Sequence, residues 1–290
     1  MELVVNAYRS DLKAFIGLVL TALLLALLAL PALALEPGSI PNFWDPKRRL
    51  EAPATTGRPS IRFLTTDDFP PFNFIDSTGQ LTGFNADLAR AVCVVIGLPC
   101  TIQARPFAEL LPALEKGDGD AVIAGLSQSA VNRDRVDFSE TYLRLPARFA
   151  VRKEDLRHEA TPEGLAGRIV AVAAGTAHEA YLTAFFPKMR LRPYPTIAEA
   201  RAALKSGEAE VLFGDGLSTS FWLGGKEADG CCTMLGGAYT EIAYFGEGLA
   251  IAVRHGDTTL RAMLDYGLQQ VYQNGTYAEL YMRYFPVGIY

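Results

Sequence analysis

The chain has 290 residues and a formal net charge of −5 at pH 7, from 27 basic and 32 acidic side chains. This acidic balance argues against a nucleic-acid partner, which would need a basic face. Residues 61–290 are enough for one large domain or for two lobes of ordinary size.

The first segment has the features of an export signal. Arg9 and Lys13 precede the apolar run AFIGLVLTALLLALLALPALAL, which closes on Ala32-Leu33-Ala34. A positive start, an apolar stretch and a small-residue end predict a secretory signal peptide over residues 1–34, cleaved after Ala34. The run is also just long enough to span a bilayer, so an uncleaved membrane anchor is the alternative.

Residues 35–60 are rich in proline and lack an apolar period. This composition predicts an extended and mostly disordered N-terminal arm. A strand, IRFLTT, follows from Ile61, and helices are expected at Asn85–Ile96 and from about Phe107. Pro112 must kink this second helix or lie close to its start.

Four cysteines occur in a chain bound for an oxidising compartment. Cys93 and Cys100 bracket a helix end and a turn, and a disulfide between them is favoured over a pair of buried thiols. Cys231 and Cys232 are neighbours, and adjacent residues fit normal disulfide geometry poorly.

Two segments of the chain read alike, ALEKGDGDAVIAG (113–125) and ALKSGEAEVLFGD (203–215). Each predicts a helix end, a glycine after the helix, an acidic turn and a short buried strand. The second helix also has a capping box, Thr196 with Glu199. One helix–strand unit used twice predicts two similar α/β lobes with parallel-rich sheets.

The unusual polar residues follow the predicted strands. Phe69, Gly125 to Ser129, Gly175-Thr176 and Asp215 all come just after a strand, where ligands of parallel sheets bind. Asp215 ends an apolar strand, so its carboxylate needs either local backbone donors or a ligand cation. These residues predict a cleft for a small polar molecule.

Catalytic and metal-binding patterns are sparse. The sequence has no nucleophile elbow, phosphate-binding loop or dinucleotide fingerprint, and its three histidines give no metal motif. His178 and Glu179 form the one candidate acid/base pair, but such residues more often make the polar first turn of a helix. The acids of the two repeats, Asp120 and Glu210 among them, are interpreted as solvated turn charges. No enzyme activity and no cofactor are therefore predicted.

Several motifs together resemble those of a known family. FPPFNFIDSTGQLTGFNADLARAV, RVDFSETY, AGTAHEA, FGD and YFGEGLAIAVRHGD occur in the order found in periplasmic solute-binding proteins of polar amino-acid ABC transporters. The resemblance covers about Ile61 to Phe285. It implies a two-lobe fold, with residues 61–147 and 248–290 in the first lobe and 148–247 in the second.

The resemblance also implies a ligand site. Phe69 and Phe107 would sandwich the ligand side chain, the Gly125 carbonyl and Asp215 would take its ammonium, and Ser127 and Thr176 its carboxylate. In this family an arginine grips that carboxylate, but counting back from VDFS places Asn132 at its position and Arg133 one residue later. Either the helix starts one residue later and Arg133 serves, or the ligand is not an ordinary α-amino acid.

The leading functional hypothesis is therefore a monomeric periplasmic protein that delivers an amine-bearing solute to an inner-membrane ABC permease. A dehydratase-like enzyme on the same fold is the first alternative. A sensor or accessory module, anchored by an uncleaved first helix, is the second.

Overall fold

A computed structural model describes residues 44, 47, 49–55, 57–285 and 288–290. The run predicted to be a signal peptide or anchor lies outside these residues. Within them, no helix combines the length and the hydropathy that a membrane span requires.

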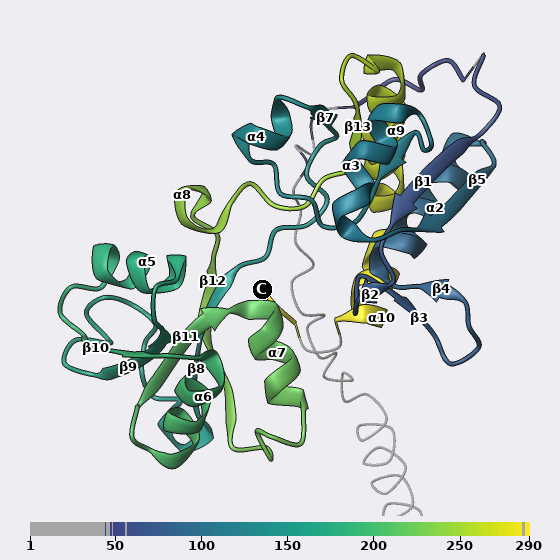
Figure 1. The fold of residues 1–290 in the computed structure, drawn as a ribbon. Helices are drawn as coiled ribbons and strands as arrows, with labels where there is room; N and C mark the ends of the chain where they lie inside the picture. Colours follow the sequence, from purple (N-terminus) through teal and green to yellow (C-terminus); the bar gives the residue numbers. More distant parts are fainter. Residues whose placement is uncertain (1–43, 45–46, 48, 56, 286–287) are drawn as a thin grey trace, which may run out of the picture. The chain divides into compact units, whose positions relative to one another are not determined.

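The first lobe is built on a five-stranded sheet with the order β5-β1-β6-β13-β7 (Figure 1). Its strands are β1 (Ile61–Thr65), β5 (Cys100–Ala104), β6 (Ala121–Val122), β7 (Val136–Phe138) and β13 (Ala252–Arg254). β1 pairs in parallel with β5 and β6, whereas β13 is antiparallel to β6 and β7. A small sheet beside it contains β2 (Asp68–Phe69), β3 (Asn73–Ile75) and β4 (Leu81–Thr82).

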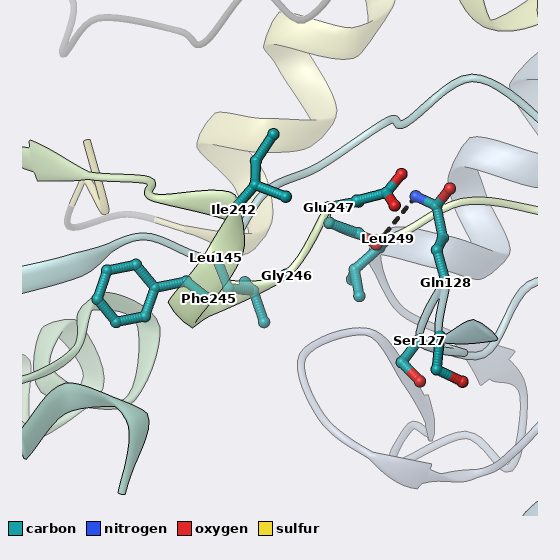
Figure 2. A pocket seen from close by; sticks show the side chains of 11 residues that line it. Ser127, Gln128, Leu145, Ile242, Phe245, Gly246, Glu247 and Leu249 are labelled. Carbon is teal, nitrogen blue, oxygen red and sulfur yellow. Dashed lines mark hydrogen bonds between the residues drawn. The ribbon is translucent and has the colours of Figure 1, made fainter. Parts of the chain in front are cut away.

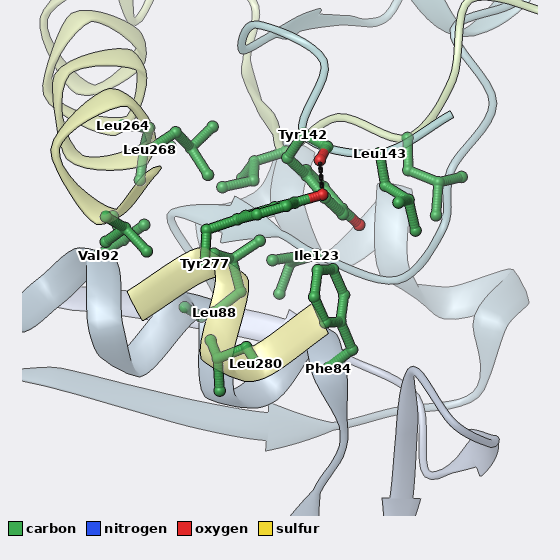
Figure 3. Packing of buried hydrophobic residues seen from close by; sticks show 14 of the residues in the cluster. Phe84, Leu88, Val92, Ile123, Tyr142, Leu143, Leu264, Leu268, Tyr277 and Leu280 are labelled. Carbon is green, nitrogen blue, oxygen red and sulfur yellow. Dashed lines mark hydrogen bonds between the residues drawn. The ribbon is translucent and has the colours of Figure 1, made fainter. Parts of the chain in front are cut away.

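Alternating side chains of the first sheet enter two cores, as the period of a strand requires. Phe63 and Ile123 pack with α2 (Phe84–Ile96), α9 (Thr258–Gln273) and α10 (Thr276–Tyr284). Figure 3 shows this core, in which the buried Tyr277 hydroxyl donates to the Tyr142 carbonyl at 2.7 Å. Leu64 and Val122 face the other side and pack with α3 (Phe107–Lys116). Pro112 lies inside α3, and the helix continues past it.

The second lobe repeats this plan in a sheet with the order β10-β9-β11-β8-β12. Its strands are β8 (Ala147–Arg152), β9 (Ile169–Ala173), β10 (Arg190–Tyr194), β11 (Val211–Asp215) and β12 (Cys232–Tyr239). β9 pairs in parallel with β10 and β11, and β8 is antiparallel to β11 and β12. α5 (Ala177–Phe185) covers one face, and α6 (Ile197–Ser206) and α7 (Gly216–Gly224) cover the other. A 3₁₀ helix (Lys153–Asp155) follows β8.

The predicted two-lobe α/β fold is confirmed. The repeated segments end in β6 and β11, which occupy corresponding places beside the first strands of their sheets. Both sheets are mixed, because in each an antiparallel strand, β13 or β8, lies next to this third strand. The capping box of Thr196 and Glu199 is present at the start of α6.

The expectation of a mostly disordered arm is wrong at Trp44. This side chain is buried in the core of the first lobe, with its ring centroid 4.9 Å from that of Tyr272 and 5.7 Å from that of Tyr277. The Leu50 amide also donates to Gln269, and Arg58 pairs with Asp257. An indole buries a large apolar area, which outweighs the cost of ordering a short stretch of chain.

All four cysteines are paired. Cys93 is joined to Cys100, as favoured from the sequence. Cys231 is joined to Cys232, although adjacent residues fit normal disulfide geometry poorly. Normal disulfides join residues that are farther apart in the chain. Here the bridge closes a small ring with the peptide that links the two cysteines.

The interpretation of the repeat acids as solvated charges is wrong for Asp120 and Glu210, whereas Asp118 and Glu208 are exposed as expected. Asp120 is buried and accepts hydrogen bonds from the Arg62 amide and guanidinium and from Arg254. Burial opposes its charge, but these hydrogen bonds hold the pKa of Asp120 below its usual value. Glu210 bonds the Ile169 amide and Arg168 in the same way.

Candidate functional site

The loop after β6 lines a hollow of about 360 Å³ (Figure 2), here called the first-lobe hollow. Ser127 bridges to Leu249, and the Gln128 amide donates to Thr141 and to the Gly248 carbonyl, which ties this loop to the returning chain. The hollow is lined by Gly125, Ser127, Gln128, Ser129, Leu145, Ile242, Phe245, Gly246, Glu247, Gly248 and Leu249.

Phe69 lies against Gly125. Gly125 has a φ of +74°, and a Cβ there would come within 3.2 Å of the Phe69 ring, so glycine is required for both reasons. Phe69 stacks on Phe72 and is 43% exposed, so one part of the ring is available for a ligand. Phe107 begins α3 and is 54% exposed, but it lines neither this hollow nor the second one.

The helix α4 (Ala130–Arg133) decides where Asn132 and Arg133 point. Ser129 is its N-cap and accepts from the Asn132 amide, so Asn132 occupies the third helical position. The Asn132 side chain turns back to donate to the Ser127 carbonyl at 2.8 Å.

Arg133 is held by two partners. Its Nε donates to the Gln128 carbonyl, and its Nη2 donates to both the Gln128 side chain and the Glu247 carboxylate. Glu247 was not identified as a candidate site residue from the sequence. Its position between Gly246 and Gly248 does indicate an acidic side chain in a loop. The arginine thus compensates an acid of the first-lobe hollow.

A second hollow, of about 320 Å³, lies at the carboxyl ends of β9 and β11. We call it the second-lobe hollow. Thr176 caps α5 here: its hydroxyl accepts from the Glu179 amide and donates to the Ala173 carbonyl at 2.8 Å. The hollow is lined by Ala173, Ala174, Thr176, His178, Pro195, Thr196, Ile197, Phe213, Gly214, Asp215 and Ser218.

One of the two carboxylate oxygens of Asp215 has a hydrogen-bond partner in the described chain. It is the N-cap of α7, and its Oδ1 accepts from the Ser218 amide at 2.7 Å. Its Oδ2 has no hydrogen-bond partner among the residues that the structure describes. One carboxylate oxygen is therefore available to a cation in the second-lobe hollow.

His178 and Glu179 point to different partners. The His178 ring packs between Phe213 and Phe245, and burial lowers the pKa of His178, with Asp215 acting in the opposite direction. The Glu179 carboxylate instead accepts from the Gly175 amide at 2.7 Å. This separation leaves the pair unsuited to joint acid/base catalysis.

The predicted site residues thus divide into two groups. Gly125 and Ser127 line the first-lobe hollow, and Thr176 and Asp215 line the second. Phe69, Asn132 and Arg133 contact residues of the first-lobe hollow without lining it, and Phe107 lines neither. In the described part of the chain, no group of three or more His, Cys, Asp or Glu side chains is placed to hold a metal ion.

The chain is similar to known solute-binding proteins. Residues 61–287 match the model of the bacterial extracellular solute-binding proteins, family 3. ABC transporter arginine-binding protein 1 of Escherichia coli K12 is 30% identical over 226 residues, which are 78% of this chain and 90% of that protein. The lysine/arginine/ornithine-binding periplasmic protein of E. coli K12 is 26% identical over 236 residues, 80% of this chain and 89% of that protein.

A solved ancestral cyclohexadienyl dehydratase has the same fold. Its TM-score is 0.65 at 23% identity, and the alignment covers 79% of this chain and 94% of that one. At this identity the likeness concerns the fold alone.

Proposed function

This chain belongs to the bacterial extracellular solute-binding proteins of family 3, and we propose that it captures a small amine-bearing solute for an ABC importer. The observation that carries the proposal is Asp215, which lines a hollow at a strand end and whose Oδ2 has no hydrogen-bond partner in the described chain. A carboxylate in such a place binds an ammonium or guanidinium ion.

The mode of binding is closure of the two lobes on the ligand. The first lobe comprises residues 61–147 and 248–290, and the second comprises 148–247. Asp215 and the Gly125 carbonyl take the ammonium group, while Phe69 and Phe107 cover the ligand side chain. Closure then presents a surface that the inner-membrane permease distinguishes from the open form.

The protein acts in the periplasm as a monomer, after cleavage of residues 1–34. The family is extracellular by description, and a relative that covers most of the chain is periplasmic by name. The mature N-terminus, read by mass spectrometry, tests export: a chain starting at Leu35 or Glu36 supports cleavage, and an intact leader supports the anchored sensor instead.

Binding is favoured over catalysis. The similar relatives reported above are binding proteins, and the dehydratase shares only the fold with this chain. A dehydratase-like enzyme would need a general acid in the cleft. His178 is the titratable side chain nearest to that role, and burial keeps it in the neutral form at neutral pH.

A thermal-shift screen tests the function directly. A ligand that binds only the folded state raises stability by RT ln(1 + [L]/Kd), about 2.7 kcal/mol at 100 times Kd. Basic amino acids and their amines should raise Tm by roughly 5–10 °C under these conditions. A screen in which only solutes without an amine or guanidine group shift Tm would contradict the proposal.

A further inference from the structure

In the described part of the chain, no lysine or arginine side chain lines either hollow, although Arg201 donates to the Ser218 hydroxyl beside the second one. Among the described residues that line the hollows, the charged side chains are Glu247 in the first-lobe hollow and Asp215 in the second. The remaining polar lining consists of hydroxyls, one amide and His178. A ligand carboxylate placed in either hollow would therefore meet an acid and no cation among the described side chains that line it.

Three of the donors that could replace a cation are already engaged. The Gly175 amide donates to Glu179 at 2.7 Å, so the amino end of α5 already holds an anion belonging to the protein. The Thr176 hydroxyl donates to the Ala173 carbonyl, and the side-chain amide of Asn132 donates to the Ser127 carbonyl. Binding a carboxylate here would break existing hydrogen bonds without gaining charge compensation.

Arg133 lies next to the first-lobe hollow, but its guanidinium is committed. Three of its N–H contacts go to Gln128 and Glu247, and one of these is the ion pair with Glu247. A ligand carboxylate would have to displace Glu247, leaving a carboxylate of the hollow without its partner.

We propose that the ligand is a small organic cation without a carboxylate, an amine or guanidine of the kind left when a basic amino acid loses its carboxyl group. This proposal rests on the proposed function and narrows its ligand class. Asp215 binds the cationic end, Phe69 packs on the methylene chain, and the absence of a carboxylate suits the acidic lining of both hollows.

Matched pairs of ligands test the proposal. Calorimetry on the purified full-length mature protein at pH 7.5 compares arginine with agmatine, lysine with cadaverine and histidine with histamine. Each pair differs only by the carboxylate. We expect the decarboxylated member of the best pair to bind at least 10-fold more tightly, which corresponds to about 1.4 kcal/mol.

A charge placed at the third position of α4 provides the converse test. Asn132→Arg should cancel or reverse the preference, because it supplies the cation that the first-lobe hollow lacks. Gln273→Arg, which adds the same charge on the exposed side of α9, is the matched control and should leave the preference unchanged. Unfolding curves of both variants establish that each is folded.

The possible failures are distinguishable. If the amino acid of a pair binds as tightly as its amine or more tightly, the inference is wrong while the proposed function stands. A 10-fold or larger loss of amino-acid affinity in Arg133→Gln would then identify Arg133 as its carboxylate partner. If no member of any pair binds, the proposed function fails and the inference fails with it.

Discussion

The two lobes hold the starts of β1 and β9 in place by the same kind of hydrogen bonds. They differ in the residues that follow β6 in the first lobe and end β11 in the second. Asp120 and Glu210, at equivalent positions of the repeat, each bond an amide of the first strand and an arginine beside it. At the other end of these strands, the first lobe has Gly125 beneath Phe69 and the second has Asp215. The repeat is thus kept where it holds the sheet and has diverged where a ligand would lie.

Helix starts show a second difference between the lobes. The helices that follow strands in the second lobe, α5, α6 and α7, begin at the side-chain caps Thr176, Thr196 and Asp215. In the first lobe, α2 and α3 begin after Gly83 and Pro106, without a side-chain cap, whereas α4 and α9 are capped by Ser129 and Asp257. Side-chain caps therefore occur in both lobes, and the difference concerns the helices that follow the first strands of the first lobe.

The largest expected effect comes from neutralising the end of β11. Asp215→Asn should lower the affinity for an amine ligand by at least 100-fold, about 2.8 kcal/mol. Asparagine can still cap α7, so stability should change little. Calorimetry measures the affinity, and Glu163→Gln, at an exposed acid of the same lobe, is the control. Unchanged affinity would make Asp215 structural and remove the functional contrast between the lobes.

Removing the carboxylate of Asp120 or of Glu210, which both lobes use to hold the first strand, should lower stability and leave ligand affinity unchanged. Asp120→Asn should lower the free energy of unfolding by about 2 kcal/mol, because a buried acceptor of charged hydrogen bonds is lost. Glu210→Gln should cost about 1 kcal/mol, since Glu210 is more exposed and has fewer partners. Thermal unfolding gives both values, and the comparison is contradicted if Glu210→Gln proves the more damaging.

The helix caps predict a smaller loss. Thr196→Ala removes both hydroxyl contacts of the capping box at α6 and should cost about 1 kcal/mol, or roughly 2–4 °C in Tm. Thr183→Ala, in the middle of α5, is the matched control, since its hydroxyl only bonds the Glu179 carbonyl one turn back. Equal losses in the two variants would show that the cap has no special weight.

The smallest effect concerns pH. Burial holds the pKa of His178 below its ordinary value of 6.5, so in acid the unfolded chain takes up a proton that the folded lobe resists. This contribution to stability is complete above about pH 6.5 and is lost as the pH falls through the lowered pKa. His178→Gln should reduce the fall in Tm between pH 7.5 and 5.5 by about 2 °C. An identical fall in both proteins would assign the acid sensitivity to other groups.

The fold was largely predictable because it rests on local patterns. Apolar periods, the repeated helix–strand unit and the Thr196 capping box each depend on neighbouring residues, and all three correspond to elements of the structure. Partnerships over long sequence distances were not predictable. Asp120 meets Arg62 and Arg254 through pairing of the first sheet, and a turn acid gives no local sign of such partners.

The places of the candidate site residues in the fold were predictable in part for the same reason. The positions of Gly125 and Asp215 follow from the ends of strands, which can be read locally. The pairing of Arg133 with Glu247 spans 114 residues and depends on how the returning chain passes α4. Sequence spacing placed Asn132 on the helix but could not show which acid would hold the neighbouring arginine.

The burial of Trp44 determines where a recombinant form of this protein should begin. The family match begins at residue 61, which is 17 positions after Trp44. The Trp44 indole nevertheless fills a space in the core beside Tyr272 and Tyr277. A recombinant chain trimmed to the family limits would leave these two tyrosine rings facing water and lose about 3 kcal/mol or more. The smallest piece that keeps a complete core therefore starts ahead of Trp44.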